Sequence, residues 1–432
     1  MVIVGGGLSG LTAARMLRDE GRRVRVLEAR SEVGGRTMDW RVAADTVAEG
    51  GAQWVGGTQH EIQRLAAELG VEVYPATVPG RTRFHFDGLR FDTAGEETSA
   101  EVQELRAKLD AIAATVPLDA PWQAPEAEAL DARTVGQWLA RQGASADAET
   151  ELSFSIATFL GDVRELSLLY LAFYIASAGS FEALEAEAQS HRLAGGPQQL
   201  CRRMADALGD SVSVSTPVLA IEHKRELVRV ATEEHVITAR HVIVAMPPSD
   251  AKRIRFAPPL PELRANLHRD WICVPGAKQH LVYDEPFWRN DGLSGTAITD
   301  FPITAFATDA SPPTGGLGVL VVFPNEEALP PTREARRAEL VREMTALFGE
   351  RAATPVAYFE KNWAEERWIS GCVSPLPPGV LTQSGPALRA AVGRIHWAGT
   401  ETSERWCGYM EGAIVAGQRA AREVDEALTA SG

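Results

Sequence analysis

The sequence predicts a mixed α/β fold in which a Rossmann-like nucleotide-binding domain carries an inserted domain of mixed sheet and helices. Three observations predict it. An apolar strand runs into a glycine-rich turn and a helix at the N-terminus, a series of short strands lies between residues 211 and 245, and glycine-rich sequence returns after residue 365. Strands that alternate with helices favour a parallel sheet, and the return of glycine-rich sequence indicates that the chain leaves the first domain and re-enters it.

Composition narrows the class of protein. The chain has 432 residues, enough for two or three domains, and 45% of them are hydrophobic, so wholesale disorder is excluded. Its 43 basic and 58 acidic side chains give a net charge of −15, which argues against a nucleic-acid partner. No apolar run is long enough to span a bilayer, and the sequence enters a strand at once, so we expect a soluble, cytoplasmic protein without membrane partners. The four scattered cysteines and nine histidines show no ligand spacing, and we expect no metal.

The N-terminal segment predicts a dinucleotide site. A strand over Val2 to Val4 precedes Gly5-Gly6-Gly7-Leu8-Ser9-Gly10, and a helix is expected over Leu11 to Glu20, then a strand over Val24 to Leu27. In this G-x-G-x-x-G pattern Gly5 makes the turn, Gly7 admits a pyrophosphate and Gly10 allows close helix packing. Glu28, followed by Ala29, stands where an acid accepts ribose hydroxyls.

A second glycine turn follows at Gly34-Gly35-Arg36. A glycine pair next to an arginine suits a second close approach to the pyrophosphate, and the guanidinium neutralises phosphate charge or faces the edge of a flavin. Dinucleotide sites for NAD usually lack this turn, so the pattern favours FAD.

Longer blocks carry a family resemblance. The chain resembles the flavin-containing monoamine oxidases of the FAD-dependent amine oxidase superfamily in these segments: GGAQWVGGTQ (50–59), DAPWQAP (119–125), VYDEPFWRNDGLSGT (282–296), KNWAEERWISGC (361–372) and WAGTETSERWCGYMEGAIVAGQRAA (397–421). The resemblance implies bound FAD and oxidation of a primary or secondary amine to an imine, which hydrolyses to an aldehyde or ketone. Dioxygen then reoxidises the flavin and yields hydrogen peroxide.

The resemblance also implies a domain division. A discontinuous FAD-binding domain is expected over 1–73, 194–267 and 366–432, and a substrate-binding domain over 74–193 and 268–365. A homodimer is left open.

Two residues match catalytic positions of the family. Lys278 matches a lysine linked through water to the flavin N5, where an ammonium assists the reaction of reduced flavin with oxygen. Tyr409 matches one of two aromatic side chains that enclose the substrate nitrogen. The partner position is Val373, so half of this cage is absent from its usual place, and Trp363 or Trp54 is a candidate for the second wall.

Further residues are expected to bind FAD. Cys372 matches the position of a covalent 8α-thioether, and both a covalent bond and an unreactive thiol stay open. The helix that begins near Gly408 is expected to direct its N-terminus at the flavin N1–C2=O region. The remaining positions expected at the cofactor are Gly51, Ala52, Gln53, Trp54, Val218, Trp363, Gly399, Thr400, Glu401 and Met410.

The substrate pocket is expected around Phe154, Ala157, Thr158, Gln189 and Val373. Three acids in the nearby loop (Glu182, Glu185 and Glu187) either form a solvated face or bind the distal ammonium of a diamine.

A polyamine or diamine oxidase therefore stays an alternative, as do a desaturase or dehydrogenase of the superfamily and a flavoprotein that has lost turnover. An L-amino-acid oxidase is a further alternative, although the loop Gly51-Ala52-Gln53-Trp54 lacks the arginine that would bind a carboxylate, a role left to Arg405 or another arginine.

Overall fold

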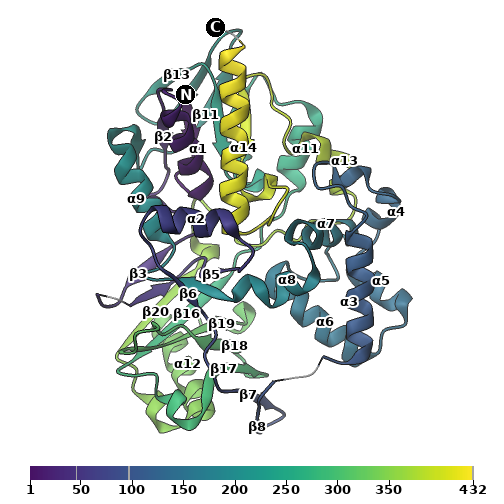
Figure 1. The fold of residues 1–432 in the computed structure, drawn as a ribbon, viewed down its shortest axis with the longest axis vertical. Helices are drawn as coiled ribbons and strands as arrows, with labels where there is room; N and C mark the ends of the chain where they lie inside the picture. The colour runs from purple at the N-terminus through teal and green to yellow at the C-terminus, as the bar shows by residue number, and fades with distance from the viewer. Residues whose placement is uncertain (45, 96–97, 431–432) are drawn as a thin grey trace.

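The computed structural model describes residues 1–44, 46–95 and 98–430, and the molecule has three regions (Figure 1). A parallel sheet with the long C-terminal helix lies at the top of this view, a mixed sheet with one long helix lies at the bottom, and a group of helices lies to the right. The expected mixed α/β class is confirmed.

The parallel sheet is built from short apolar strands buried on both faces, as the composition of the N-terminal strand predicts. Ile3 pairs with Val26 on one side and Ile243 on the other. The strand order is β10-β2-β1-β14-β21, with bounds Val212–Ser213, Arg25–Leu27, Val2–Val4, Val242–Ala245 and Ile395–Ala398. Segments from the two ends of the chain therefore lie in one sheet.

One face of this sheet is covered by helices that share a single apolar core. They are α1 (Leu8–Asp19), α2 (His60–Glu68), α9 (Gln198–Leu208) and α14 (Met410–Thr429). The helix α1 begins three residues earlier than Leu11, directly at the end of the glycine turn. It crosses α14 closely, because a Cβ on Gly417 would lie 2.3 Å from the carbonyl oxygen of Ser9.

The other face packs against a four-stranded sheet of order β13-β12-β11-β15. Its strands are Val236–Ala239, Val228–Ala231, Ala220–His223 and Arg255–Ala257. The predicted series of strands over 211–245 is confirmed, and it divides between the two sheets.

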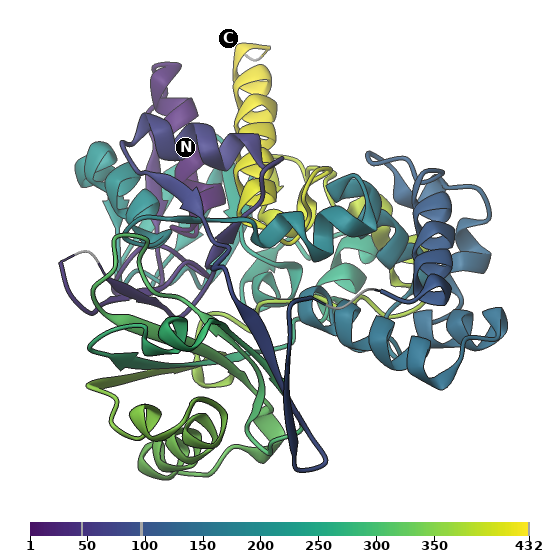
Figure 2. The same cartoon turned by 60° about the horizontal axis from the view of Figure 1, so that its bottom comes forward.

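The mixed sheet has seven strands in the order β20-β16-β19-β18-β17-β7-β8. Their bounds are Ala357–Asn362, Ala277–Tyr283, Gly318–Pro324, Thr304–Asp309, Leu293–Thr299, Arg81–Phe86 and Leu89–Thr93. The helix α12 (Arg333–Phe348) packs on one face. The β7–β8 hairpin projects from the edge of the sheet (Figure 2).

Residues 100–185 contain six α-helices of the side region, which share one core with two later helices. Their bounds are α3 (Ala100–Ala113), α4 (Ala127–Asp131), α5 (Val135–Gln142), α6 (Ala146–Phe159), α7 (Leu168–Ala178), α8 (Phe181–Glu185), α11 (Glu262–Asp270) and α13 (Val380–Ser384). Leu267 and Trp271 belong to this core, so the chain changes region within α11. The domain boundaries given above stay a prediction.

Two small sheets connect the regions. One pairs β3 (Asp39–Arg41) with β4 (Val47–Glu49), and the other has the order β5-β9-β6 with bounds Trp54–Val55, His191–Leu193 and Val73–Pro75. Within the described ranges, none of the helices has the length and apolar character needed to cross a membrane.

Candidate functional site

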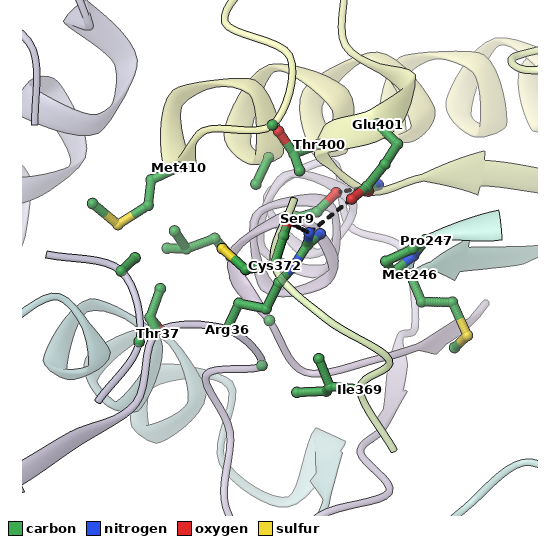
Figure 3. A pocket seen from close by; sticks show the side chains of 18 of the residues that line it. Ser9, Arg36, Thr37, Met246, Pro247, Ile369, Cys372, Thr400, Glu401 and Met410 are labelled. Carbon is green, nitrogen blue, oxygen red and sulfur yellow. Dashed lines mark hydrogen bonds and ion pairs between the residues drawn. The ribbon is translucent and has the colours of Figure 1, made fainter. Parts of the chain in front are cut away.

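One elongated cavity begins at the carboxyl ends of β1 and β2 and reaches the helical region. Its wall at one end includes Val4, Glu28 and Val218, and at the other end Gln189 and Tyr409. Figure 3 shows that side chains from both ends of the sequence meet along it. Ligands of open parallel sheets bind at such carboxyl edges.

The first glycine turn forms the floor of the cavity. Gly5 has φ +107°, and a Cβ there would lie 2.7 Å from the carbonyl oxygen of Ala245, while a Cβ on Gly10 would lie 2.0 Å from the oxygen of Gly5. A Cβ on Gly7 would meet no atom nearer than 3.8 Å. Gly5 and Gly10 are therefore needed for packing. Gly7 instead leaves open space at the cavity wall, where a pyrophosphate can approach the backbone.

The acid after β2 is fixed by the backbone. The Glu28 carboxylate accepts hydrogen bonds from the amides of Gly6 (2.6 Å) and Arg30 (2.8 Å). Burial raises the pKa of this carboxyl group, and these amide hydrogen bonds oppose the rise. The side chain is thus held at the cavity wall, where it can accept ribose hydroxyls.

An ion pair joins the second glycine turn to the C-terminal motif. The Arg36 Nη1 lies 2.7 Å from Glu401 Oε1, and the amide of Gly399 donates to Ser9 Oγ at 2.9 Å (Figure 3). Burial alone would lower the pKa of Arg36, but Glu401 raises it above its ordinary value. The second carboxylate oxygen, Glu401 Oε2, is buried without a partner in the described chain, so the pair retains an acceptor beside the cavity.

Lys278 enters the cavity from β16 and is 8% exposed. Its Nζ donates to the carbonyl oxygen of Gly51 (2.8 Å) and to Gln53 Oε1 (2.9 Å). The ammonium also lies 5.3 Å from the ring centroid of Trp54 and 5.0 Å from that of Phe323. Burial lowers the pKa of Lys278 to about 8.

The far end of the cavity is aromatic. The ring of Tyr409 lies 5.9 Å from that of Tyr174 and stands edge-on to Trp406 at 5.0 Å. Trp54 and Phe323 stack at 5.8 Å. Electron-rich ring faces attract an amine nitrogen in its neutral or charged form.

Tyr409 is the residue before α14, which starts at Met410, so the expected helix N-terminus does border the cavity.

A loop carrying Cys372 and Val373 closes one side. The amide of Cys372 donates to the oxygen of Val274 (3.0 Å), and its own carbonyl oxygen accepts from Arg36 Nη1 (3.1 Å). Cys372 is exposed, while Cys201 and Cys407 are buried.

Most residues expected at the site line this cavity: Gly5, Gly7, Ser9, Glu28, Ala29, Gly35, Arg36, Gly51, Ala52, Gln53, Trp54, Thr158, Gln189, Val218, Lys278, Cys372, Val373, Gly399, Thr400, Glu401, Gly408, Tyr409 and Met410. Four residues are absent from the lining. Gly10 packs within the turn, Trp363 donates from its indole to the oxygen of Gly50 (2.9 Å), Phe154 is 43% exposed and Ala157 is also exposed.

Sequence reasoning missed several lining residues, among them Phe159, Tyr170, Tyr174, Phe323 and Trp368. Tyr170 and Tyr174 carried a signal, because hydroxyls four residues apart in an apolar helix mark one face. Phe323 carried none, since it continues the apolar strand GVLVVFP.

The described residues hold no cluster of three or more histidine, cysteine or acidic side chains suited to a metal ion.

Comparisons with known proteins agree with this geometry. Residues 8–425 match the family model described as flavin containing amine oxidoreductase. The chain is similar to human amine oxidase [flavin-containing] B, with 36% identity over 99% of this chain and 86% of that protein.

Two solved structures are also similar. The cyclohexylamine oxidase of Brevibacterium oxydans has TM-score 0.92 and 34% identity, with 99% of each chain covered. A putrescine oxidase bound to putrescine has TM-score 0.91 and 32% identity, with 98% of each chain covered.

We predict that Gly408→Ala destabilises the aromatic end. Gly408 has φ +88°, and a Cβ would lie 2.2 Å from Tyr174 Oη. Steric overlap of this kind costs about 1–3 kcal/mol, measurable as a lower free energy of unfolding.

The double variant Gly408→Ala/Tyr174→Phe removes the clashing oxygen and should recover part of that loss. Full recovery would show that the positive φ costs nothing, and no recovery would place the strain elsewhere.

Proposed function

The chain belongs to the family of flavin-containing amine oxidoreductases, and on that premise we propose that it oxidises monoamines with an uncharged, apolar substituent. It is a flavin amine oxidase, and the family implies FAD as its cofactor. When bound, the flavin accepts the two electrons of the amine C–N oxidation and passes them to oxygen.

The cavity fits FAD in two respects. Gly7 leaves the backbone open to a pyrophosphate, and the buried, unpartnered Glu401 Oε2 offers an acceptor to the cofactor. We propose that Glu28 holds the ribose, Arg36 neutralises the pyrophosphate and Val218 borders the adenine. All three residues line the cavity at the end that contains the glycine turns.

The observation that carries the substrate class is that, among the described lining residues, no acidic side chain stands at the aromatic end. The acidic lining residues among those described are Glu28, Asp250 and Glu401. The first is held by two backbone amides, the second accepts from the amide and hydroxyl of Ser370, and the third pairs with Arg36. Each carboxylate is therefore already engaged within the chain, and the remaining oxygen of Glu401 is the acceptor assigned above to the cofactor.

The loop acids that favoured a diamine do not line the cavity. Glu182 and Glu187 are exposed, and Glu185 pairs with Arg106 (2.6 Å) and accepts from Ser155 (2.7 Å). A diamine or polyamine would therefore bury its second charge without compensation, which is costly.

An amino-acid substrate is disfavoured by the same reasoning. Among the described lining residues only Arg36 and Arg253 are arginines, and Arg36 pairs with Glu401. Arg253 donates to the carbonyl oxygen of Arg367, beside α10 (Pro248–Ala251), and Arg405 is outside the lining. No guanidinium is placed to bind a carboxylate at the aromatic end.

Tyr409 and Lys278 have different proposed roles, the first in orienting the amine and the second in the reaction with oxygen. The Tyr409 ring orients the amine nitrogen toward the flavin, with Tyr174 behind it and Val373 leaving room for a bulky substituent. The Lys278 ammonium supplies positive charge for the reaction with oxygen. Trp54 and Phe323 exclude water around this ammonium and are our candidates for the second aromatic wall in place of Trp363.

Assembly as a homodimer is tested by light scattering on the purified holoenzyme.

We predict that Lys278→Met slows reoxidation of the flavin by oxygen about tenfold or more and changes its reduction by amine less. In the native enzyme the reoxidation rate should fall as pH rises through about 8, since the ammonium is the form present below the pKa of Lys278. The variant should lack this decline. Stopped-flow absorbance measures both half-reactions.

Lys361→Met is the matched control, because Lys361 pairs with Lys278 in register but binds Glu366 and is absent from the cavity wall. Equal slowing of both half-reactions in Lys278→Met would contradict the assigned role.

The substrate class is tested by anaerobic bleaching of the flavin. Cyclohexylamine and benzylic amines should bleach it faster than putrescine, spermidine or amino acids. The variant Gln189→Glu adds a carboxylate at the aromatic end and should raise kcat/KM for putrescine relative to cyclohexylamine about tenfold.

The uncharged variant Gln189→Met controls for altered shape. If the native enzyme prefers putrescine, the proposed substrate class is wrong, while the flavin amine oxidase assignment is untouched.

Covalent attachment of FAD through Cys372 is supported by its exposed thiol in the cavity wall. We predict that flavin stays with acid-precipitated native protein and is released from Cys372→Ala. Cys273→Ser, outside the lining, is the control. Release of flavin from the native protein would show that the cofactor is held without a covalent bond.

A further inference from the structure

Lys278 forms no direct ion pair among the described residues. Its three hydrogen-bond acceptors are the carbonyl oxygens of Glu49 (3.4 Å) and Gly51 and the amide oxygen of Gln53, all of them neutral. Within the described ranges no acidic side chain lies within 4.0 Å of its Nζ. A buried ammonium in this position tends to lose its proton.

A buried ion pair lies behind this lysine. The carboxylate of Glu49 binds Arg192 Nη2, and the two side chains are 0% and 4% exposed. Neither residue lines the cavity. Glu49 thus accepts a hydrogen bond from Lys278 through its backbone carbonyl oxygen and binds Arg192 through its carboxylate.

A second acid stands opposite. Asp39 pairs directly with Glu49 in the β3–β4 register and is 6% exposed. Burial and the neighbouring Glu49 raise the pKa of Asp39 well above its ordinary value. Two facing carboxyl groups favour one negative charge between them. Burial raises the pKa of Glu49 and Arg192 opposes that rise, so we assign this charge to Glu49.

Among the other groups around the lysine, Cys372 and Asp39 also raise the pKa of Lys278, although less than Glu49 does. His280, on the same face of β16, is fully buried, and burial lowers its pKa well below the ordinary value, so its ring is neutral. Cys372 faces the lysine from the cavity wall. Tyr74 and Asp309 lie near Arg192 rather than near the lysine.

We propose that Glu49, anchored by Arg192, is a positioning residue whose carboxylate keeps Lys278 in its ammonium form beside the flavin. This proposal rests on the role assigned to Lys278 above. Arg192 acts in the opposite direction on the lysine, because its positive charge repels the ammonium. The two members of the pair therefore have opposite influences on the same proton.

The direction of each influence follows from charge. Burial lowers the pKa of Lys278 to about 8, Glu49 is the strongest group opposing that fall, and Arg192 adds to it. Loss of the Glu49 charge therefore removes the ammonium at lower pH. Loss of Arg192 leaves Glu49 buried without its partner, so Glu49 becomes neutral and no longer supports the ammonium.

The chain allows a direct measurement, because it contains five lysines, at positions 108, 224, 252, 278 and 361. Of these, Lys278 alone is buried. In the FAD-loaded enzyme labelled with [ε-13C]lysine, the NMR signal of Lys278, assigned by its loss in Lys278→Met, gives its titration midpoint without any substrate.

Glu49→Gln should lower the midpoint of Lys278 by about one pH unit, the scale of one nearby opposite charge. Arg192→Met should lower it as well, because Glu49, buried without its partner, takes up a proton. Glu360→Gln is the matched control. Glu360 lies on the neighbouring strand β20, pairs in register with Gln279 and binds Arg336. Side chains alternate along a strand, so Gln279 and Lys278 point to opposite faces of the sheet, and this variant removes a carboxylate from the other face.

A lower Lys278 midpoint in both variants, with an unmoved midpoint in Glu360→Gln, supports the proposal, because general damage to packing would also move the control. If one of the two variants does not fold, the other still decides the question. An unmoved Lys278 midpoint in a folded, flavin-loaded variant overturns the proposal. A shift in Glu360→Gln as large as that in Glu49→Gln overturns it too. Failure of the lysine's own role is read separately, from the half-reactions of Lys278→Met.

Discussion

The ion pair between Arg36 and Glu401 is the contact on which the site depends. Arg36 follows the second glycine turn, and Glu401 belongs to the C-terminal motif, so the pair joins the two ends of the chain at the carboxyl edge of the parallel sheet. The hydrogen bond from Gly399 to Ser9 reinforces the same junction. Every element that lines the cavity is positioned relative to this edge.

A division of charge runs along the cavity. The dinucleotide end contains acids and arginines that are already paired with each other or with backbone amides, while the aromatic end contains Lys278 as its charged side chain among the described residues. For the substrate class proposed above, this division makes selectivity depend on ring faces and on the cost of burying a second charge, rather than on a direct ion pair with the substrate.

The cofactor end could be predicted from the sequence because its requirements are local. A positive φ at Gly5 and a close backbone contact at Gly10 each demand glycine, and such demands leave a readable spacing. The substrate end depends on tertiary packing. Phe154 and Thr158 lie one turn apart on α6, yet only Thr158 reaches the cavity, since Leu152, Ile156 and Phe159 fix the helix in its core. Of the two candidates for the second aromatic wall, Trp54 could be named from the sequence, whereas Phe323 could not, because it comes from a distant strand.

The walls of the aromatic end come from unrelated elements: Thr158 from α6, Gln189 from the turn after α8, Phe323 from β19 and Val373 from a loop. None of them belongs to the glycine turns. Single substitutions at these four positions can therefore change the range of substrates during evolution without altering the glycine turns. A laboratory library restricted to the same four positions would test new amine substrates while the dinucleotide site stays intact.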